Sequence, residues 1–161
     1  MTAAASAGLT LDTGALLALD HPAKAIAMQA RLDETLRRGG TVCVPVGTIA
    51  QAWRSARQVR LARLLKSRDI DIALMTPNVA RTVGLMCALC GHDDVIDVHA
   101  ALCARERHHV LVTSDPADML RIDPALPVIR ALPSCARAWA GRSLAWARPV
   151  EDAAHDPARL G

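Results

Sequence analysis

Short apolar runs alternate along this sequence with longer amphipathic segments. The apolar runs lie at residues 9–11, 42–44, 70–75, 110–112 and 127–129, and each has the length of a single strand. The segments between them are expected to be helical. Because parallel strands are joined by crossover helices, this alternation predicts an α/β fold with a central parallel sheet of about five strands. Helices would cover both faces of that sheet, which gives three layers, α/β/α.

Glycine and proline mark the ends of the predicted helices. Pro22 separates the first two, and Gly39-Gly40 ends the second, as glycines after a last helical turn often do. The segment 47–67 is expected to form two helices with a break near Arg57. In one straight helix its arginines, spaced by three residues, would drift around the cylinder, because a turn has 3.6 residues.

The length of 161 residues favours a single domain. We expect residues 1–132 to form it, and residues 133–161, which show no clear period, to be a C-terminal arm or a poorly ordered tail. No apolar run approaches the ~20 residues of a membrane-spanning helix, and residues 1–8 lack the pattern of a secretion signal. The sequence therefore predicts a cytoplasmic protein without membrane contact.

The charged residues are unevenly distributed, although the net charge is only +3. Residues 35–68 contain eight Lys or Arg and no acid, whereas residues 93–123 contain seven acids and three Lys or Arg. A basic flank beside an acidic pocket suits a phosphate-backbone substrate that is brought to bound cations. Two solvated helix faces of opposite charge would give the same pattern. The scarcity of aromatic residues (three Trp, no Phe or Tyr) counts against modules that stack RNA bases on aromatic side chains.

Several aspartates stand where a parallel sheet would bring them together. Asp12 and Asp115 each end a predicted strand, and α/β proteins place their sites outside the carboxyl ends of the strands. Asp94 and Asp97 share one face at the start of a predicted helix, and Asp118 follows Asp115 by the same three residues. Alone, any of these residues is more simply a helix cap or a turn residue.

Together, Asp12, Asp97 and Asp115 favour a metal site. Converging carboxylates repel each other by about 4 kcal/mol per pair at ~4 Å and an effective dielectric of ~20, so a cation must offset the repulsion. Oxygen ligands with few nitrogens favour Mg²⁺ or Mn²⁺ over zinc. Such an ion lowers the pKa of bound water and aligns a phosphodiester, which allows hydrolysis without a nucleophilic side chain.

Four stretches of the chain resemble, in this order, the motifs of VapC-type PIN-domain toxins: LTLDTGALLAL, VPVGTIAQAWR, DDVIDVHAALCARE and VLVTSDPADML. The match spans residues 9–132. The resemblance implies a PIN-like fold and a metal-dependent endoribonuclease, the toxin of a type II toxin–antitoxin pair, which a VapB-like antitoxin holds inactive. It also implies structured RNA (tRNA or ribosomal RNA) as the substrate, inhibition of translation or growth, and, by analogy alone, a homodimer.

The resemblance assigns roles to individual residues. It maps the family's metal-binding acids onto Asp12, Asp97 and Asp115, and Asp94 joins them as an assisting catalytic acid. The accessory positions near the metal are Thr13, Ser114 and Asp118. From the basic segment itself, the candidate contacts to RNA or to the antitoxin are Trp53, Arg54 and Arg57.

One position departs from the family pattern. Where similar proteins usually carry Glu, before a short residue and Trp-Arg, this chain has Gln51. An amide keeps an oxygen ligand but loses the negative charge, and no other acid lies between Glu34 and Asp69. The alternative is therefore a catalytically attenuated PIN-fold module, which binds RNA or the antitoxin without efficient cleavage.

A zinc-structured binding protein is the third hypothesis. Cys87, Cys90 and His92 resemble half of a zinc site, and His99 and Cys103, four residues apart on a predicted helix, would complete it. A lone Cys-x-x-Cys in a strongly helical, apolar stretch is a weak signal, however. Such cysteines more often pack as small hydrophobic side chains.

Overall fold

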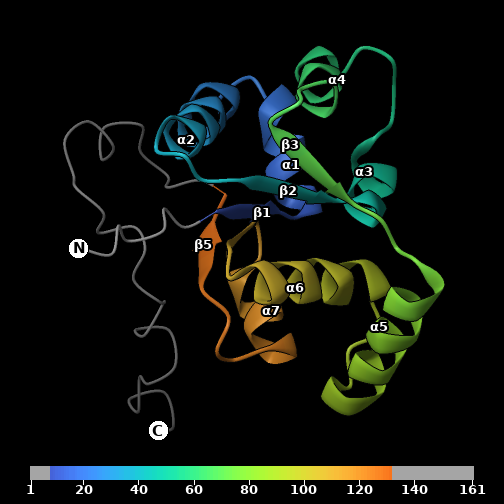
Figure 1. Ribbon diagram of the computed structural model, residues 1–161. Coiled ribbons are helices and arrows are strands. Elements are labelled where there is room, and N and C mark those ends of the chain that lie inside the picture. Colours follow the sequence, from blue (N-terminus) through green and yellow to red (C-terminus); the bar gives the residue numbers. More distant parts are fainter. Residues whose placement is uncertain (1–7, 132–161) are drawn as a thin grey trace, which may run out of the picture.

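The computed structural model describes residues 8–131, which form one five-stranded sheet in which neighbouring strands are all parallel. The strand order is β3-β2-β1-β4-β5, so that β1 lies at the centre (Figure 1). The strands are β1 (Leu9–Leu11), β2 (Val42–Pro45), β3 (Ile70–Ala73), β4 (Val110–Thr113) and β5 (Val128–Arg130). The predicted parallel sheet of five strands is confirmed.

Helices cover both faces of the sheet (Figure 1). In the described part of the chain they are α1 (Thr13–Asp20), α2 (Ala25–Arg37), α3 (Val46–Ala52), α4 (Val59–Leu65), α5 (Pro77–Cys90), α6 (Val95–Arg107) and α7 (Pro116–Ile122). Helices α1, α2 and α4 lie on one face, and α5, α6 and α7 lie on the other. Helix α3 lies at the carboxyl ends of the strands, where it contacts α1 and α6. The three-layer arrangement matches the prediction.

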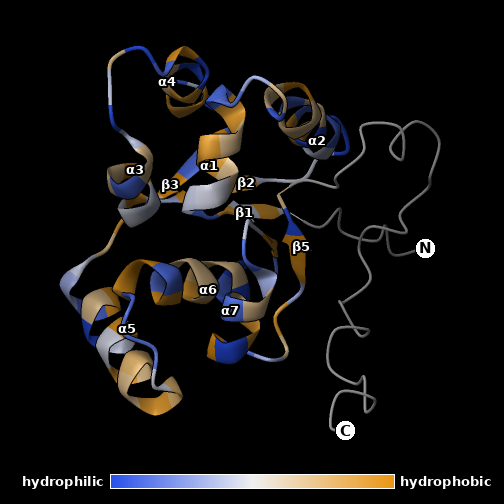
Figure 2. Cartoon of the chain, turned by 180° about the vertical axis from the view of Figure 1, so that it is seen from behind, coloured by the Kyte–Doolittle hydropathy of each residue, from blue (hydrophilic) through white to orange (hydrophobic). Residues whose placement is uncertain are grey.

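Two hydrophobic clusters join the helices to the sheet. The first includes Leu16 of α1 and Met28 of α2, both fully buried against the central strands. The second includes Val98 of α6 and Leu111 of β4, which are also fully buried. Strands β1, β2 and β4 are buried along their whole length, as expected where helices cover both faces. Helices at the surface, such as α2 and α4, carry both hydrophobic and hydrophilic residues (Figure 2).

The expected break between two helices is present, because α3 ends at Ala52 and α4 begins at Val59. The side chain of Gln58 stabilises the connection. Its Oε1 accepts hydrogen bonds from the backbone N–H groups of Arg54 (2.6 Å) and Ser55 (3.0 Å), and its Nε2 donates to the carbonyl of Ala52 (2.9 Å). The loop that leads into α4 is hydrophilic (Figure 2), which leaves its arginines at the surface.

The third strand differs from its predicted form. It ends at Ala73, two residues earlier than the apolar pattern indicates, and it does not alternate strictly, because Asp71 and Ile72 are both exposed. Strand β3 is at the edge of the sheet and pairs only with β2. An edge strand has fewer neighbours to cover it, so its apolar residues are less completely buried.

Some predictions concern parts of the chain that are not described. The C-terminal arm predicted at residues 133–161 lies outside the described residues, as do residues 1–7. Of the helices between residues 8 and 131, none combines the length and the apolar character that a membrane-spanning helix requires.

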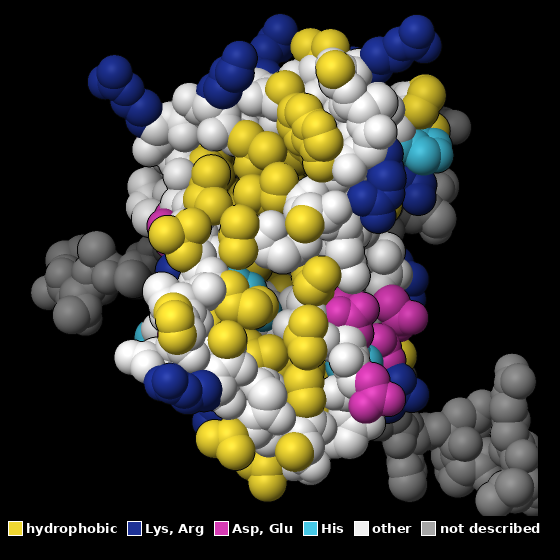
Figure 3. All heavy atoms as spheres, turned by 90° about the vertical axis from the view of Figure 1, so that its right-hand side faces the viewer, with side chains coloured by type: hydrophobic (Ala, Val, Ile, Leu, Met, Phe, Trp, Pro, Cys, Tyr) yellow, Lys and Arg dark blue, Asp and Glu magenta, His cyan; other side chains and the backbone are white. Residues whose placement is uncertain are grey.

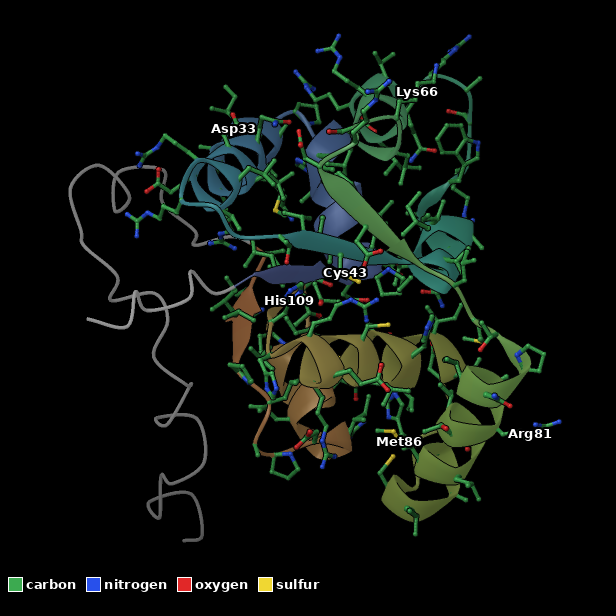
Figure 4. All side chains as sticks on the ribbon, viewed as in Figure 1. Asp33, Cys43, Lys66, Arg81, Met86 and His109 are labelled. Carbon is green, nitrogen blue, oxygen red and sulfur yellow. The ribbon has the colours of Figure 1, made fainter. Side chains whose placement is uncertain are left out.

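Two buried histidines differ in their hydrogen bonding. His109 is 5% exposed, although its place in a turn predicts exposure, and its ring nitrogens lie 3.2 Å from the hydroxyl of Thr10 and 2.9 Å from that of Thr41. It lies where the first strand meets β4 (Figure 4). His99 is 1% exposed, and within residues 8–131 neither ring nitrogen has a hydrogen-bond partner. Burial lowers the pKa of both rings.

Replacing His99 by Leu is expected to raise the free energy of unfolding by about 1–2 kcal/mol, because the change removes unpaired polar atoms from the core. Urea denaturation at pH 7.5 measures the gain. Burial lowers the pKa of His99 in the folded protein, so the unfolded chain binds its proton more readily, and stability falls as the pH drops below about 6.5. The substitution should reduce that acid-induced loss.

The matched control is His109→Leu, which removes a buried ring of the same type but leaves the hydroxyls of Thr10 and Thr41 without that partner. We expect this variant to be destabilised by about 1–3 kcal/mol. Equal destabilisation of the two variants would contradict the assignment of His99 as an unpaired core residue.

Candidate metal centre

Asp12 is the most deeply buried acid of the candidate site. It directly follows β1 and is the N-cap of α1, where its Oδ1 accepts the backbone N–H of Thr13 at 2.5 Å. The residue is 5% exposed. Burial raises the pKa of Asp12, the nearby charge of Asp94 raises it further, and the hydrogen bonds to its oxygens act in the opposite direction. The strand end and the helix start therefore hold a carboxylate in a position where ionisation is costly.

Thr113 joins the ends of β1 and β4. Its fully buried hydroxyl donates to Asp12 Oδ2 at 2.7 Å, and its Oγ1 accepts the backbone N–H of Asp115 at 3.1 Å. The supporting hydroxyl predicted from the sequence is that of the next residue, Ser114, but Ser114 is exposed. Thr113 was not among the predicted site residues, and its signal in the sequence is a hydroxyl at the last position of an otherwise aliphatic strand.

Asp94 and Asp97 lie at the start of α6, near the carboxyl ends of the strands. Asp94 is the N-cap, and its Oδ1 accepts the backbone N–H groups of Ile96 (2.8 Å) and Asp97 (3.3 Å). The pKa of Asp97 is raised to about 6, first by burial and then by the charges of Asp12 and Asp94. The structure thus brings Asp12 close enough to Asp94 and Asp97 to interact with them, although it lies far from both in the sequence.

Gln51, on α3, links two other members of the site. Its Oε1 accepts the hydroxyl hydrogen of Thr13 at 2.6 Å, and its Nε2 lies 3.4 Å from Asp94 Oδ2, to which it donates. Thr13 is therefore placed beside the site, but its hydroxyl is directed to the amide. An acid in place of Gln51 would face Asp94 with an anionic oxygen, so the amide relieves a repulsion that a Glu would create.

His92 lies beside two of the acids. Its Nε2 is 3.4 Å from Asp97 Oδ2 and 3.7 Å from Asp118 Oδ2. Within residues 8–131, His92, Asp97 and Asp118 form the group of potential metal ligands whose donor atoms all lie within 4.8 Å of one another. From the sequence, His92 is a candidate ligand only together with the cysteines of the zinc hypothesis. Its proximity to Asp97 depends on the turn between α5 and α6, which no local pattern reveals.

Asp115 also lies near the carboxyl ends of the strands, but its carboxylate has a different environment from those of Asp12 and Asp97. It is exposed and caps α7, where its Oδ1 accepts the backbone N–H of Asp118 at 3.3 Å. Its connection to Asp12 runs through its backbone N–H and the hydroxyl of Thr113. Of the three acids predicted to hold a metal, Asp12 and Asp97 interact directly, whereas the carboxylate of Asp115 is engaged at the helix start.

The basic candidates lie outside this acidic cluster. Trp53 is 40% exposed, and Arg54 and Arg57 are exposed in the loop between α3 and α4. Arg54 Nη1 donates to the carbonyls of Ala50 (3.0 Å) and Trp53 (3.1 Å), which holds the guanidinium near the end of α3. Seen from the side of the strand ends, acidic side chains gather in one patch with a histidine beside it, and Lys and Arg side chains lie above that patch (Figure 3).

The cysteines of the zinc hypothesis are divided between two parts of the fold. Cys87 and Cys90, at the end of α5, are partly buried against the α5–α7 cluster. Cys103 is buried in another cluster with Cys43 of β2 and Ala73 of β3, between the sheet and α6 (Figure 4). In the described part of the chain no cysteine belongs to a group of potential metal ligands.

The donor atoms at the sheet edge fit a divalent cation. They are carboxylate oxygens with one imidazole nitrogen, a set that Mg²⁺, Mn²⁺ and related ions accept. Asp12 and Asp97, whose pKa values are both raised in the protein without an ion, would lose this penalty once a cation lies between them. In the described part of the chain, the donor atoms that converge within 4.8 Å of one another are those of Asp97, Asp118 and His92, which would hold an ion, and Asp12 and Asp94 lie close enough to raise the pKa of Asp97.

Replacing Asp97 by Asn should stabilise the metal-free protein at pH 7.5 by about 1–3 kcal/mol, because it removes a charge that burial and two acids disfavour. The folded protein keeps the proton on Asp97 up to a pH of about 6, whereas the ordinary pKa of an aspartate is 3.8. Stability therefore falls as the pH rises through this window, and the advantage of the variant should disappear near pH 4. Urea denaturation in EDTA at both pH values measures this change.

The control is Asp33→Asn on the exposed face of α2, which should change stability by less than about 0.5 kcal/mol. Destabilisation of metal-free Asp97→Asn at pH 7.5 would show that this carboxylate is not under the repulsion described.

Comparison with protein-family models and with curated proteins finds no match. Among solved structures, the chain is similar to one described as FitAB bound to an IR36 DNA fragment. The TM-score is 0.56 at 16% sequence identity, and the likeness covers 76% of this chain and 94% of that chain. At this identity the likeness concerns the fold. Together with the parallel sheet and its two helical layers, it confirms the predicted PIN-like α/β/α fold.

Proposed function

We propose that the protein is a metal-dependent endoribonuclease of the PIN-like fold and the toxin of a type II toxin–antitoxin pair in the cytoplasm. The observation that carries the proposal is the meeting of Asp12, Asp94 and Asp97 at the carboxyl edge of a parallel sheet. Burial raises the pKa of Asp12 and of Asp97, and nearby acids raise both further, which is typical of carboxylates in sites built for a cation. Resemblance of the surrounding motifs to VapC-type toxins supports the nuclease class.

Each residue of the site has a distinct part in the proposed reaction. A divalent cation would supply a bound water of lowered pKa and positive charge near the scissile phosphodiester. Asp12 is fixed for metal binding by Thr113 and by the start of α1, so its carboxylate loses little freedom when an ion binds. Asp97 would bind the ion from α6, with Asp94 as an assisting acid. Asp115 and Asp118 would line the exposed side of the site, where the substrate enters.

The surface near the acids suits a polyanion. Arg54 and Arg57 lie in the loop after α3, the helix that carries Gln51 into the site. On the other side, a pocket of about 260 Å³ borders the strand ends and includes three basic residues among its lining: His21, Lys24 and Arg130. Ser114 also lines that pocket. Phosphate groups on both sides of a scissile bond would meet positive charge, which agrees with tRNA or ribosomal RNA as the substrate.

A VapB-like antitoxin is the proposed protein partner, with a homodimer as the proposed assembly. Trp53 is 40% exposed, and other large apolar side chains of α1 and α4 are also exposed, namely Leu17 (46%) and Val59 (59%). Exposed aromatic and aliphatic groups of this size are common at protein–protein interfaces. An antitoxin that covered Trp53 would also cover the adjacent Arg54, a proposed contact to RNA.

Replacing Asp12 by Asn is expected to reduce metal-dependent RNA cleavage to the level of an EDTA-treated sample. The amide keeps the size of the side chain and one acceptor oxygen, which can accept from Thr113 or from Thr13, but it removes the buried charge that attracts the ion. The measurement is cleavage of purified tRNA and ribosomal RNA, with a DNA oligonucleotide in parallel, at millimolar Mg²⁺ or Mn²⁺. Asp33→Asn is the matched control and should cleave at the wild-type rate.

Cleavage that persists at the wild-type rate in Asp12→Asn, with a folded variant by circular dichroism, would refute the assignment of the nuclease site. Cleavage that is insensitive to EDTA would refute the role of the metal.

A second function is favoured by the contacts of Gln51. The amide is satisfied at both ends, by Thr13 and by Asp94, without contributing a charge. A site with one acid fewer attracts a cation less strongly. The alternative is therefore an attenuated PIN-fold module that binds RNA or the antitoxin and cleaves inefficiently.

Restoring the acid with Gln51→Glu distinguishes the two functions. If the natural protein is attenuated, the variant should bind Mg²⁺ more tightly and cleave RNA at least about tenfold faster, a change of about 1.4 kcal/mol in the barrier. In the metal-free state it should be less stable than wild type, because the new carboxylate faces Asp94. Gln29→Glu on α2 adds the same charge away from the site, beside Asp33, and is the control for metal binding and cleavage. Unchanged cleavage would eliminate attenuation at this position.

A further inference from the structure

His92 is held at the acidic edge by the ends of two helices. Helix α5 ends at Gly91, whose φ of 66° is a left-handed conformation that glycine adopts readily. The backbone N–H of His92 donates to the carbonyl of Cys87 at 3.3 Å. Two residues later, Asp94 caps α6. Hydrogen bonds therefore hold both ends of the turn, which fixes the position of the backbone at His92.

The imidazole nitrogen and two carboxylate oxygens converge in this turn. His92 Nε2 faces Oδ2 of Asp97 and Oδ2 of Asp118, at 3.4 and 3.7 Å. The side chain of His92 is 12% exposed and that of Asp97 19%, so the group is shielded from solvent on several sides. The second oxygen of Asp118 pairs with Arg121, which orients the first toward His92.

The separation of 3.4 Å lies within the range expected between adjacent ligands of one metal ion, and that of 3.7 Å lies slightly above it. Two ligands bonded at roughly 2.1 Å to the same ion lie about 3 to 3.5 Å apart when they are adjacent. A protonated imidazole paired with two carboxylates would show similar distances. The neighbouring charges of Asp12 and Asp94, which raise the pKa of Asp97, add negative charge on the far side of the group. A divalent ion neutralises more of that charge than a single proton on His92.

We propose that His92 is a metal ligand, and that with Asp97 and Asp118 it forms a mixed nitrogen and oxygen site that selects a divalent transition-metal ion over Mg²⁺. Imidazole binds Mn²⁺ and the later transition metals more readily than Mg²⁺, which prefers oxygen ligands throughout. The imidazole nitrogen is a donor atom that adds no negative charge to the site. Gln51, which stands where similar proteins usually carry Glu, already lowers that charge by one. The role of this ion in cleavage rests on the proposed function, whereas its binding does not.

The experiment measures metal binding by the full-length protein, with Mn²⁺ as the probe. Titration followed by the electron paramagnetic resonance of free Mn²⁺ gives the affinity, and competition with Mg²⁺ gives the selectivity. Pulsed measurements detect modulation from a directly coordinated imidazole nitrogen. We expect that modulation in the wild-type protein, and its loss in His92→Ala together with at least about tenfold weaker Mn²⁺ binding.

Two variants make the test specific. His92→Asp replaces the nitrogen by an oxygen ligand, so it should still bind a cation but shift the preference toward Mg²⁺. His108→Asn removes an exposed histidine at the opposite end of α6, and should keep both the affinity and the nitrogen modulation. Asn also tolerates the left-handed conformation that His108 adopts, with a φ of 53°.

The outcomes separate this inference from the nuclease assignment. Mn²⁺ bound without nitrogen modulation, or bound equally well by His92→Ala, would overturn the role of His92, and so would failure of the wild-type protein to bind Mn²⁺. RNA cleavage assayed on the same samples reports independently on the proposed function. Metal-dependent cleavage that is retained in His92→Ala would leave the nuclease standing without this ligand. Nitrogen-coordinated Mn²⁺ in a protein that cleaves no RNA would uphold the ligand and refute the nuclease.

Discussion

Repulsion among carboxylates at one edge of a parallel sheet is the constraint on which the interpretation of this protein depends. Asp12 is 5% exposed and lies near the charge of Asp94, and the pKa of Asp97 is raised to about 6, first by burial and then by the charges of Asp12 and Asp94. A fold selected for stability alone would place apolar or paired groups there. Asp12 accepts hydrogen bonds and Asp97 lies beside His92, yet the pKa values of both acids stay raised, and the proposed nuclease function takes a cation as the partner that would offset this penalty.

The architecture brings these acids together with ordinary structural devices. A parallel sheet presents all its carboxyl ends on one edge, and helix starts offer backbone N–H groups that hold acidic side chains. Asp12, Asp94 and Asp115 are all N-caps. Capping orients each carboxylate without requiring a salt bridge. The hydroxyl of Thr113 then links the ends of the two central strands, so the geometry of the site is coupled to the register of the sheet.

The balance of charge and donor atoms is what distinguishes this site. Gln51 provides an amide that satisfies Thr13 and Asp94 but carries no charge. His92 provides a nitrogen beside Asp97 and Asp118 and likewise adds no negative charge. Gln51 and His92 therefore keep the number of donor atoms in the site high without adding to its negative charge. A site of this kind relies on the identity of its ligands for metal selection more than on their total charge.

The sequence by itself determined the architecture and part of the site. Apolar runs separated by helical periods are local patterns, so the five strands, the break at Gln58 and the strand-end acids Asp12 and Asp115 could be predicted from residue order. Only the tertiary structure decided that His92 and Thr113 belong to the site, that Asp115 uses its carboxylate as a cap, and that His109 is buried with partners. These depend on contacts between segments far apart in the chain, or on the path of a turn, and such contacts leave no periodic signal in the sequence.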